Sequence, residues 1–429
     1  MTSRETSDIH HSLWRNHDFM VLWTSQTVSA LGSSMSFFVF PLVGLALTGS
    51  LIQAAFAGTA FTLGSVASRL PAGVLVDRWN RRKVLFASSA AGAALYASLA
   101  LAMLGDSLSI GHLVVVAFAS GVVSSFFLPA ETASLRRVVP TEELPTAFSH
   151  NQARRHVADL AGAPLGGILY GLGRAFPFLF DSVTYALSAV AITRMRTPLP
   201  APRRDHAESS TMVRDIGEGL RFMLSHEFFR AFLAFAALAN FASKALFLVL
   251  ILKLASAGVS PAMIGAIDAA GGLAGIVGAF CAPWLIRRIP NGWLAIVGGL
   301  VSAVVLIPIA YTNDPFLIGG LIGLVLLINP AANASVASYL TAVTPDRFQG
   351  RTGASLSFCV TLLMPLGPLT GGWLLHTVGG PDAILITSGL TALAVAPLLL
   401  SGEVRRLPTP DRWAIPESDA MATAGILRA

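Results

Sequence analysis

Cysteine and charge are both scarce in this chain of 429 residues. The two cysteines, Cys281 and Cys359, lie in apolar runs without CxxC or histidine-rich spacing, so neither a disulfide framework nor a metal site is predicted. The phosphate-binding pattern Gly-x-x-x-x-Gly-Lys-Ser/Thr is missing, which argues against ATP as an energy source. No histidine forms a nucleophile constellation with nearby serine and aspartate. We therefore predict neither an enzyme nor a protein with a bound cofactor.

Charged residues make up 12% of the chain, whereas soluble domains usually contain about a quarter. Apolar residues make up 54%, and the mean hydropathy is +0.68. A net charge of +6 is compatible with a nucleic acid partner. However, the basic residues stand singly or in short clusters between apolar runs, without the aromatic and basic platform of RNA-binding proteins. The composition predicts a protein of the lipid bilayer that crosses it many times, with no nucleic acid partner.

Twelve apolar runs are long enough to cross a bilayer, whose hydrocarbon core of about 30 Å needs about 20 helical residues. Gly, Pro and polar residues separate these runs. The predicted fold class is all-α integral membrane, with twelve transmembrane helices in two pseudo-symmetric six-helix bundles. The predicted spans are 20–46, 51–76, 84–104, 110–131, 147–172, 175–194, 228–254, 260–286, 292–311, 315–340, 349–377 and 382–401.

Lysine and arginine gather on one side of the predicted membrane. They lie before the first span, after the second, fourth and eighth spans, in the loop between the sixth and seventh, and in the tail. Examples are Arg15, Arg78, Arg82, Arg136, Arg137, Arg287, Arg288, Arg405 and Arg406. The opposite side has only Arg174 and Lys253. By the positive-inside rule, both termini and the central loop are predicted to be cytoplasmic, in the plasma or inner cell membrane.

The segment from Thr197 to Ser210, TPLPAPRRDHAESS, has three prolines and no apolar periodicity, which indicates a linker. It separates two predicted six-helix bundles at 19–195 and 228–401. The remaining parts are predicted as a cytoplasmic N-terminal segment over 1–18, a cytoplasmic linker over 196–227 and a cytoplasmic tail over 402–429.

The two predicted bundles repeat one another at a constant offset of 205 residues. The matching pairs are Pro140 and Pro345, Gly162 and Gly367, Gly166 and Gly371, and Gly167 and Gly372. At the same offset Arg82 falls on Arg287, but Asp77 falls on Ala282. A parallel repeat of this kind is a known plan of secondary transporters, in which a central site lies between two halves that rock against each other.

The stretch GVLVDRWNRRK, from Gly73 to Lys83, places one acid inside a basic cluster. The cluster alone would anchor the loop on the cytoplasmic side. Asp77 needs another role, because an acid adds nothing to such an anchor. It can accept hydrogen bonds from Arg78 or Arg82 and sit near the positive N-terminus of the eleventh span.

This stretch resembles the cytoplasmic loop motif of the major facilitator superfamily, Gly-x-x-x-Asp-Arg-x-x-Arg-Arg/Lys. The resemblance implies a latch between the halves that holds the outward-facing state, with Gly73 letting the helices approach closely. The candidates for this conformational gate are Gly73, Asp77, Arg78, Arg81 and Arg82.

Further stretches resemble the drug:proton antiporter branch that includes macrolide efflux and siderophore export proteins. They are LWRNHDFMVLWTSQTVSALGSS, FFLPAETASLRRVVPTEELPTA and GEGLRFMLSHEFFRAFLAFAALANF. The branch pattern Gly-Pro-x-x-Gly-Gly occurs at Gly367, Pro368, Gly371 and Gly372, whereas Gly162, Pro164, Gly166 and Gly167 have the proline one place late. Where many relatives have an acid after the first-helix glycine, this chain has Ser33 and Ser34.

Ionisable residues inside predicted spans are costly and hence functional candidates, and four acids and one lysine qualify by position. The proton-coupling candidates are Asp159, Asp181, Asp268 and Glu131, and the substrate-cavity candidate is Lys244. Glu131 is expected to pair with Arg136 or reach the headgroups, and Asp181 either to pair with Arg174 or to titrate. Asp268 either titrates or faces the outer vestibule. Asp159 either carries the coupling proton or forms a static pair with Arg155, four residues earlier on the same helix face.

These patterns predict a transporter that exports small amphipathic organic compounds by alternating access, with proton antiport as the expected energy source. The alternatives are a siderophore or endogenous-metabolite exporter, a lysophospholipid transporter, and, from another class, a receptor or scaffold that does not transport. The expected partners are a small-molecule substrate, a coupling proton and the lipid bilayer, and the expected functional unit is a monomer.

Overall fold

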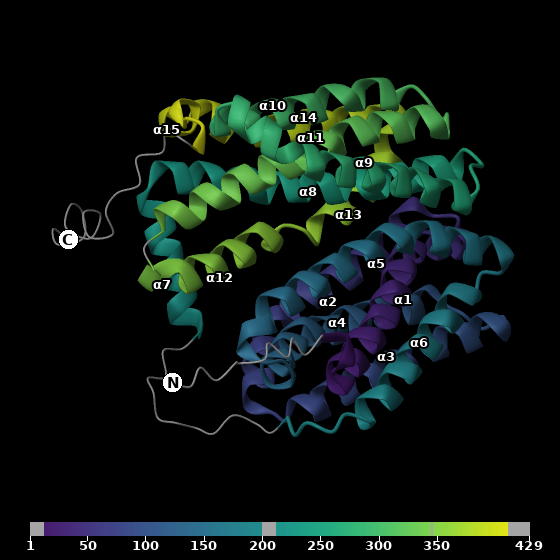
Figure 1. The fold of residues 1–429 in the computed structure, drawn as a ribbon. Helices are drawn as coiled ribbons and strands as arrows, with labels where there is room; N and C mark the ends of the chain where they lie inside the picture. Colours follow the sequence, from purple (N-terminus) through teal and green to yellow (C-terminus); the bar gives the residue numbers. More distant parts are fainter. Residues whose placement is uncertain (1–12, 200–211, 345, 411–429) are drawn as a thin grey trace, which may run out of the picture.

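The structure is a computed structural model that describes residues 13–199, 212–344 and 346–410, and every element within these ranges is a helix (Figure 1). The helices of the first half follow one another through short turns. They are η1 (Leu13–Arg15), α1 (His17–Thr48), α2 (Leu51–Arg78), α3 (Arg81–Leu104), α4 (Ile110–Val138), η2 (Thr141–Glu143), α5 (Leu144–Leu172) and α6 (Phe176–Thr193). The turn between α1 and α2 includes Gly49, whose φ of 65° favours glycine.

The second half begins with a short helix, α7 (Met212–Ser225), and continues through longer ones. These are α8 (Glu227–Ser256), α9 (Pro261–Arg288), α10 (Asn291–Ala310), α11 (Pro315–Val343), α12 (Asp346–Leu362), α13 (Leu366–Val378), α14 (Gly380–Leu400) and α15 (Gly402–Arg406).

Side-chain caps mark the starts of many of these helices. A side-chain oxygen of the preceding residue accepts a hydrogen bond from a first-turn N–H, which satisfies a donor that the helix itself leaves unpaired. The capping residues are Asn16, Ser50, Asn80, Ser109, Ser260 and Asp314. These short polar residues therefore place most helix starts where the predicted spans begin.

Eleven segments of the described chain are long and apolar enough to cross a membrane. The remaining predicted span, 147–172, corresponds to α5, a helix of comparable length that carries Arg154, Arg155 and Asp159. These charges lower its hydropathy but do not interrupt it. The all-α fold with twelve membrane helices is confirmed.

The predicted span over 349–377 is two helices instead of one. α12 ends at Leu362 and α13 begins at Leu366, with tight turns through Leu363, Met364 and Pro365 between them. Pro365 has no N–H to continue the hydrogen-bond ladder, and its ring disfavours a helical residue before it. The break lies beside α8, because a Cβ on Gly367 would lie 2.7 Å from Lys244 Cβ.

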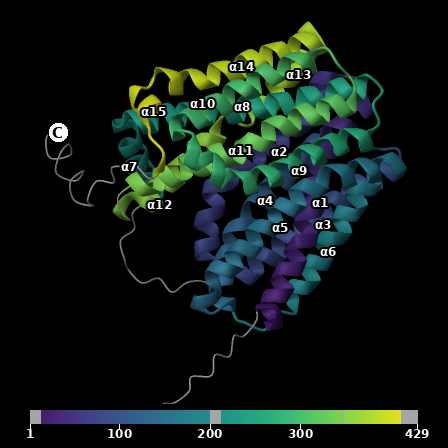
Figure 2. The ribbon, with the colours of Figure 1, turned by 45° about the horizontal axis from the view of Figure 1, so that its top comes forward.

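The two halves form separate bundles whose main contacts are between α5 and α9 and between α2 and α13, with smaller contacts of α8 with α1 and α2 (Figures 1 and 2). Glycines make both contacts close. A Cβ on Gly265 of α9 would lie 2.7 Å from Pro164 Cα of α5, and a Cβ on Gly372 of α13 would lie 3.2 Å from the Leu51 carbonyl oxygen of α2. These contacts lie at the end of the molecule opposite the basic cluster of Arg78, so the halves are held together at that end.

The predicted linker over 196–227 contains a helix, α7, that packs against α12. Residues 200–211 of this linker, 1–12 of the N-terminal segment and 411–429 of the tail lie outside the described residues. The domain boundaries given above remain predictions.

Candidate transport passage

A cavity of about 780 Å³ opens at the basic end of the molecule, between α2 and α4 of the first half and α12 of the second. Serine and threonine side chains line much of its wall, including Ser65, Ser124, Ser125, Thr132 and Ser357. Its ionisable lining residues are Arg69, Asp77, Arg81, Arg136 and Arg137. The cavity is therefore polar and mainly basic, and it lies at the end where the halves are apart.

The predicted gate residues divide between this cavity and a helix end. Gly73, Asp77 and Arg81 line the cavity, and Arg78 is exposed. Arg82 turns the other way and donates through Nε to the Ile192 carbonyl oxygen at 3.2 Å, and through its guanidinium also to the Thr193 carbonyl oxygen. It thus binds the C-terminal carbonyls of α6, where a cation is favoured.

The expected bond between Asp77 and Arg78 or Arg82 is therefore not formed in this structure, because Arg82 is occupied by α6. In the described part of the chain, Asp77 has no ion pair within 4.0 Å. The carboxylate faces the open cavity instead.

Lys244 of α8 lies among aromatic rings that face the passage between the halves. Its Nζ is 5.4 Å from the ring centroid of Phe37 in α1 and 5.8 Å from that of Phe247. These two rings stack on each other with centroids 5.8 Å apart. The face of an aromatic ring attracts a cation electrostatically, so the two rings hold the ammonium in place of a carboxylate.

Two carboxylates, one in each half, interact electrostatically with the charge of Lys244. In the described part of the chain, neither forms an ion pair with it within 4.0 Å. Asp159 belongs to α5 and Asp268 to α9, and both side chains are exposed. Sequence analysis named all three residues but treated them separately. The structure brings them together as one charged cluster at the junction of the halves.

Asp159 accepts a hydrogen bond from Ser34 Oγ of α1 at 2.9 Å. The expected pair with Arg155 is not formed, because the Arg155 guanidinium donates to Gln152 Oε1 at 3.3 Å. A pair four residues apart on a helix contributes only about 0.2–0.5 kcal/mol, whereas a hydrogen bond to a charged group contributes about 1.5–3 kcal/mol. The bond to Ser34 is therefore the stronger competitor.

Asp181 of α6 is fully buried against α1. Its Oδ2 accepts a hydrogen bond from Ser36 Oγ at 2.7 Å, and its Oδ1 accepts one from Thr184 Oγ1 at 3.3 Å. The expected pairing with Arg174 is wrong. Arg174 precedes the first residue of α6, so the two residues do not share one helix face.

The serines of α1 connect these acids. Ser34 binds Asp159 and Ser36 binds Asp181, while Ser33 shares a hydrogen bond of 2.8 Å with the Tyr185 hydroxyl. Where the family resemblance leads one to expect an acid on the first helix, this chain has hydroxyls on α1 and the acids on α5 and α6.

Glu131 of α4 forms a buried ion pair with Arg154 of α5, with Oε1 2.6 Å from the guanidinium nitrogen. The expected pairing with Arg136 is wrong, because five residues rotate a helix by roughly 140° and Arg136 is exposed on another face. Glu131 and Arg154 are 3% and 4% exposed, so neither reaches the headgroups. Two further guanidinium nitrogens of Arg154 have no partner in the described structure.

The repeated glycines occupy equivalent places in the two halves. Gly162 and Gly166 of α5 pack against Ser34 and Met35 of α1, and Gly367 and Gly371 of α13 pack against Lys244 and Ala245 of α8. Gly167 and Gly372 instead face the other half, at Pro261 of α9 and Ala55 of α2. Lys244 thus occupies in the second half the place that Ser34 occupies in the first, which puts it at the depth of Asp159.

Sequence analysis missed Arg69, although it lies inside the predicted span over 51–76. Its guanidinium extends across the cavity and donates to Thr361 Oγ1 of α12 at 3.2 Å, so it joins the two halves. The available signal was its position, because an arginine inside a predicted span is as unusual as the acids that were named.

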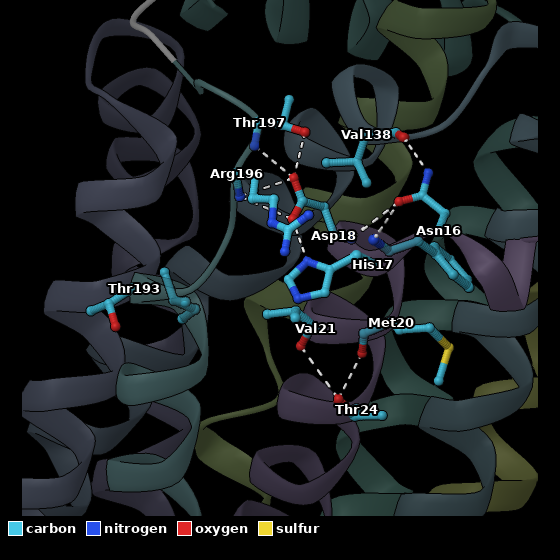
Figure 3. A network of polar contacts seen from close by, with 12 residues as sticks. Asn16, His17, Asp18, Met20, Val21, Thr24, Val138, Thr193, Arg196 and Thr197 are labelled. Carbon is cyan, nitrogen blue, oxygen red and sulfur yellow. Dashed lines mark hydrogen bonds and ion pairs between the residues drawn. The ribbon is translucent and has the colours of Figure 1, made fainter.

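Asp18 is a second residue that was missed, and it connects the start of α1 to the segment after α6 at the basic end of the first half (Figure 3). Its carboxylate accepts hydrogen bonds from the backbone N–H of Arg196 at 3.0 Å and of Thr197 at 2.6 Å, and from Thr197 Oγ1 at 2.5 Å. Glu227 does the same at the start of α8, where it accepts from Ser401 Oγ at 2.8 Å. In each half, an acid therefore ties the first membrane helix to the chain that follows the last one.

Two bundles of membrane helices with a one-sided polar cavity and a charged cluster at their junction define a membrane transport protein. The family model described as Major Facilitator Superfamily matches residues 22–325 and 233–426. The chain belongs to this superfamily, which consists of transporters and not enzymes.

Several bacterial proteins resemble the chain in sequence. The uncharacterized MFS-type transporter YfiS of Bacillus subtilis (strain 168) is 26% identical over 87% of this chain and 91% of its own length. The multidrug efflux pump Tap of Mycobacterium tuberculosis (strain ATCC 25618 / H37Rv) is 25% identical, and macrolide efflux protein A of Streptococcus pyogenes is 21% identical. The match to Tap covers 49% of this chain and 51% of Tap, and the match to macrolide efflux protein A covers 47% and 50%.

Solved structures share the fold at low sequence identity. A bacterial homologue of the human lysosomal transporter Spinster, in an inward-facing and unoccupied conformation, has a TM-score of 0.73 at 16% identity, over 94% of this chain and 99% of that one. The nucleoside transporter NupG has a TM-score of 0.70 at 12% identity, over 90% and 99%.

Proposed function

We propose that the chain exports small amphipathic organic compounds by alternating access, coupled to proton antiport. The observation that carries this proposal is the asymmetry between the two ends of the molecule: the halves pack together through α5–α9 and α2–α13 away from the basic end, while the cavity that residues of both halves line lies at the basic end. A transporter must open its central site to one side at a time. The efflux pumps that resemble parts of this chain support export as the direction.

The basic end is the cytoplasmic end in this proposal, because lysine and arginine favour that side. Both chain termini then lie in the cytoplasm, and the protein sits in the plasma or inner membrane. The structure corresponds to an inward-open state, and the fold similarity to an inward-facing transporter supports this assignment. The proposed functional unit is a monomer.

Closure of the basic end would bring Asp77 toward the N-terminal end of α12, which begins at Asp346. A carboxylate is stabilised at the positive end of a helix, and Arg82 already fixes the adjacent loop to α6. Asp77 then acts as the latch of the outward-facing state, with Arg81 and Gly73 beside it. In this arrangement the contact between Asp77 and the N-terminal end of α12 forms only when the cavity closes.

Asp159 is the proposed proton carrier, with Asp268 as its counterpart on the other half. Both acids act on Lys244. A rocking motion of the halves changes the distance of Asp159 from the lysine, whereas Asp268 stays in the same half as Lys244. Asp181 and Glu131 are buried together with their partners in the first half, whereas Asp159 and Asp268 are exposed, so the two buried acids are the weaker candidates.

The test is efflux of a panel of fluorescent amphipathic dyes from cells that do or do not express the chain, with and without a protonophore. The expected result is lower dye accumulation in expressing cells, abolished by the protonophore. An unchanged accumulation for every dye, with the protein present in the membrane, would contradict the proposal. Asp159→Asn tests the coupling, because it keeps the size of the side chain and removes the titratable carboxyl group.

A further inference from the structure

Arg69 stands apart from the other basic residues of the molecule by its depth. It precedes Arg78, at the end of α2, by nine residues, which corresponds to about 13 Å along a helix. An arginine so far into a membrane helix is costly, and orientation alone needs charges only near the helix ends. At the offset of 205 residues its counterpart is Ala274, although Arg287 and Arg288 preserve the basic end of α9. The positive-inside rule therefore does not account for Arg69.

The guanidinium of Arg69 has no acidic partner within 4.0 Å in the described part of the chain. It donates instead to a neutral hydroxyl, Thr361 Oγ1, at 3.2 Å. An arginine has five N–H donors in a planar fork, which suits a carboxylate or phosphate and leaves donors free after one bond to threonine. Hydroxyls of Ser65 and Ser357 line the same cavity and add neutral donors.

The whole cavity is electropositive. Four arginines and one aspartate line it, so four positive charges and one negative charge leave a net charge of +3. A charged cleft with low-dielectric walls concentrates ions of the opposite sign. Another positive charge, at the junction of the halves, is Lys244, which has the acids Asp159 and Asp268 nearby and lies over the rings of Phe37 and Phe247. These rings offer an apolar surface beside a second cation.

We propose that Arg69 is a substrate-binding residue that recognises the anionic group of an amphipathic monoanion, a molecule with an apolar body and one carboxylate or phosphate. The anion replaces Thr361 as the partner of the guanidinium, and this releases the contact between α2 and α12. The proposal rests on the transport function proposed above and specifies its substrate class. The anion is either a water-soluble carboxylate or the headgroup of an anionic lysolipid.

The experiment compares a matched pair of probes, an NBD-labelled long-chain carboxylic acid and the NBD-labelled primary amine of the same chain length. Binding to the purified full-length chain and efflux from expressing cells are both measured for wild type, Arg69→Met and Arg69→Lys. NBD-labelled lysophosphatidylglycerol is the third probe and represents the lipid source. Arg287→Gln is the matched control, because it removes one basic charge at the same end of the molecule, outside the cavity. Size-exclusion profiles confirm that each variant folds.

The expected result is preferential binding of an anionic probe by the wild-type chain. Arg69→Met weakens that binding by about tenfold or more, the effect of losing charge-assisted hydrogen bonds. Arg69→Lys retains part of it, and Arg287→Gln retains all of it. Whichever anionic probe binds more tightly identifies the source.

Two results would overturn the inference. Preference of the wild-type chain for the amine, or an equal loss of acid and amine in Arg69→Met, would remove Arg69 from anion recognition while leaving the transport function intact. If the wild-type chain exports none of the three probes and none of the dyes in the panel, the proposed function fails, and this inference fails with it.

Discussion

The two halves of the molecule treat their polar side chains differently. In the first half, Glu131 pairs with Arg154, Asp181 binds Ser36, and Asp159 binds Ser34, so each of these three acids has a partner on a neighbouring helix of the same half. In the second half, Lys244 and Asp268 face the passage without an ion-pair partner in the described structure, and α12–α13 is interrupted beside Lys244.

This difference indicates a division of labour. A satisfied polar network holds helices in one arrangement, because each buried group that loses its partner is costly. Charge without a fixed partner and a broken helix allow two arrangements of similar energy. We therefore expect changes in the first half to affect stability first, and changes at the junction or in the second half to affect conformation and substrate choice first.

The largest effect is expected from breaking the Glu131–Arg154 pair. Glu131→Gln leaves a buried guanidinium uncompensated, and removal of one partner from a buried pair costs about 3–5 kcal/mol. The yield of folded protein and its melting temperature, followed by fluorescence-detected size exclusion, should fall sharply. The double variant Glu131→Gln with Arg154→Gln should recover most of the loss, since no charge is then left unpaired. Equal stability of the single variant and wild type would show that the pair does not hold the first half together.

A wedge at the contact between the halves should shift conformation more than stability. A Cβ on Gly265 would lie 2.7 Å from Pro164 Cα, so Gly265→Ala must push α9 away from α5. Overpacking costs about 1–3 kcal/mol, and each 1.4 kcal/mol is tenfold in population. Cysteine labelling at the end opposite the basic cluster should therefore become faster. Gly320→Ala is the control, because no heavy atom lies within 4 Å of the added Cβ. Unchanged labelling in Gly265→Ala would contradict the importance of this contact.

The two aspartates bound to α1 serines should separate coupling from stability. Asp181→Asn alters a fully buried group with two side-chain partners and should destabilise by about 1–3 kcal/mol. Asp159→Asn alters an exposed group, so it should fold normally but lose protonophore-sensitive export while retaining energy-independent exchange. Retained uphill export in Asp159→Asn would move the proton role to Asp268, Asp181 or Glu131.

The smallest effect is expected at Lys244. Lys244→Met keeps a flexible body of similar length against Phe37 and Phe247 but removes the cation, so expression should stay near wild type. The range of exported dyes should change, with anionic dyes losing most. If substrate does not protect a cysteine placed at this position from alkylation, and the dye range is unchanged, Lys244 is only a structural contact.

Much of the fold follows from the sequence because membrane spans are long, apolar and capped by recognisable residues such as Ser50 and Asn80. The interruption at Pro365 was less visible, because hydropathy averages over a broken helix as readily as over a continuous one. The repeated glycines identified the contacts between helices, since close packing requires small residues at fixed spacing.

The partners of the charged residues were harder to predict. Arg154 is 23 residues from Glu131 on another helix, and neither composition nor spacing fixes how α4 rotates against α5. Sequence neighbours such as Arg136 and Arg155 were considered as partners for the same reason. Arg136 lies on another helix face than Glu131, and Arg155 donates to Gln152 and not to Asp159. Asp18 was missed because it lies before the first predicted span, and Arg69 was missed although it lies inside the second.

The most direct test of alternating access is a pair of distances measured by electron spin resonance, with Cys281 and Cys359 replaced by alanine. Spin labels at Thr132 and Ser357 report on the basic end, and labels at Leu172 and Tyr311 report on the opposite end. A proton gradient should shift the two distance distributions in opposite directions, one shortening as the other lengthens. Asp77→Asn should leave the basic end open under the same conditions. Distances that stay fixed, or that change in the same direction at both ends, would contradict the account.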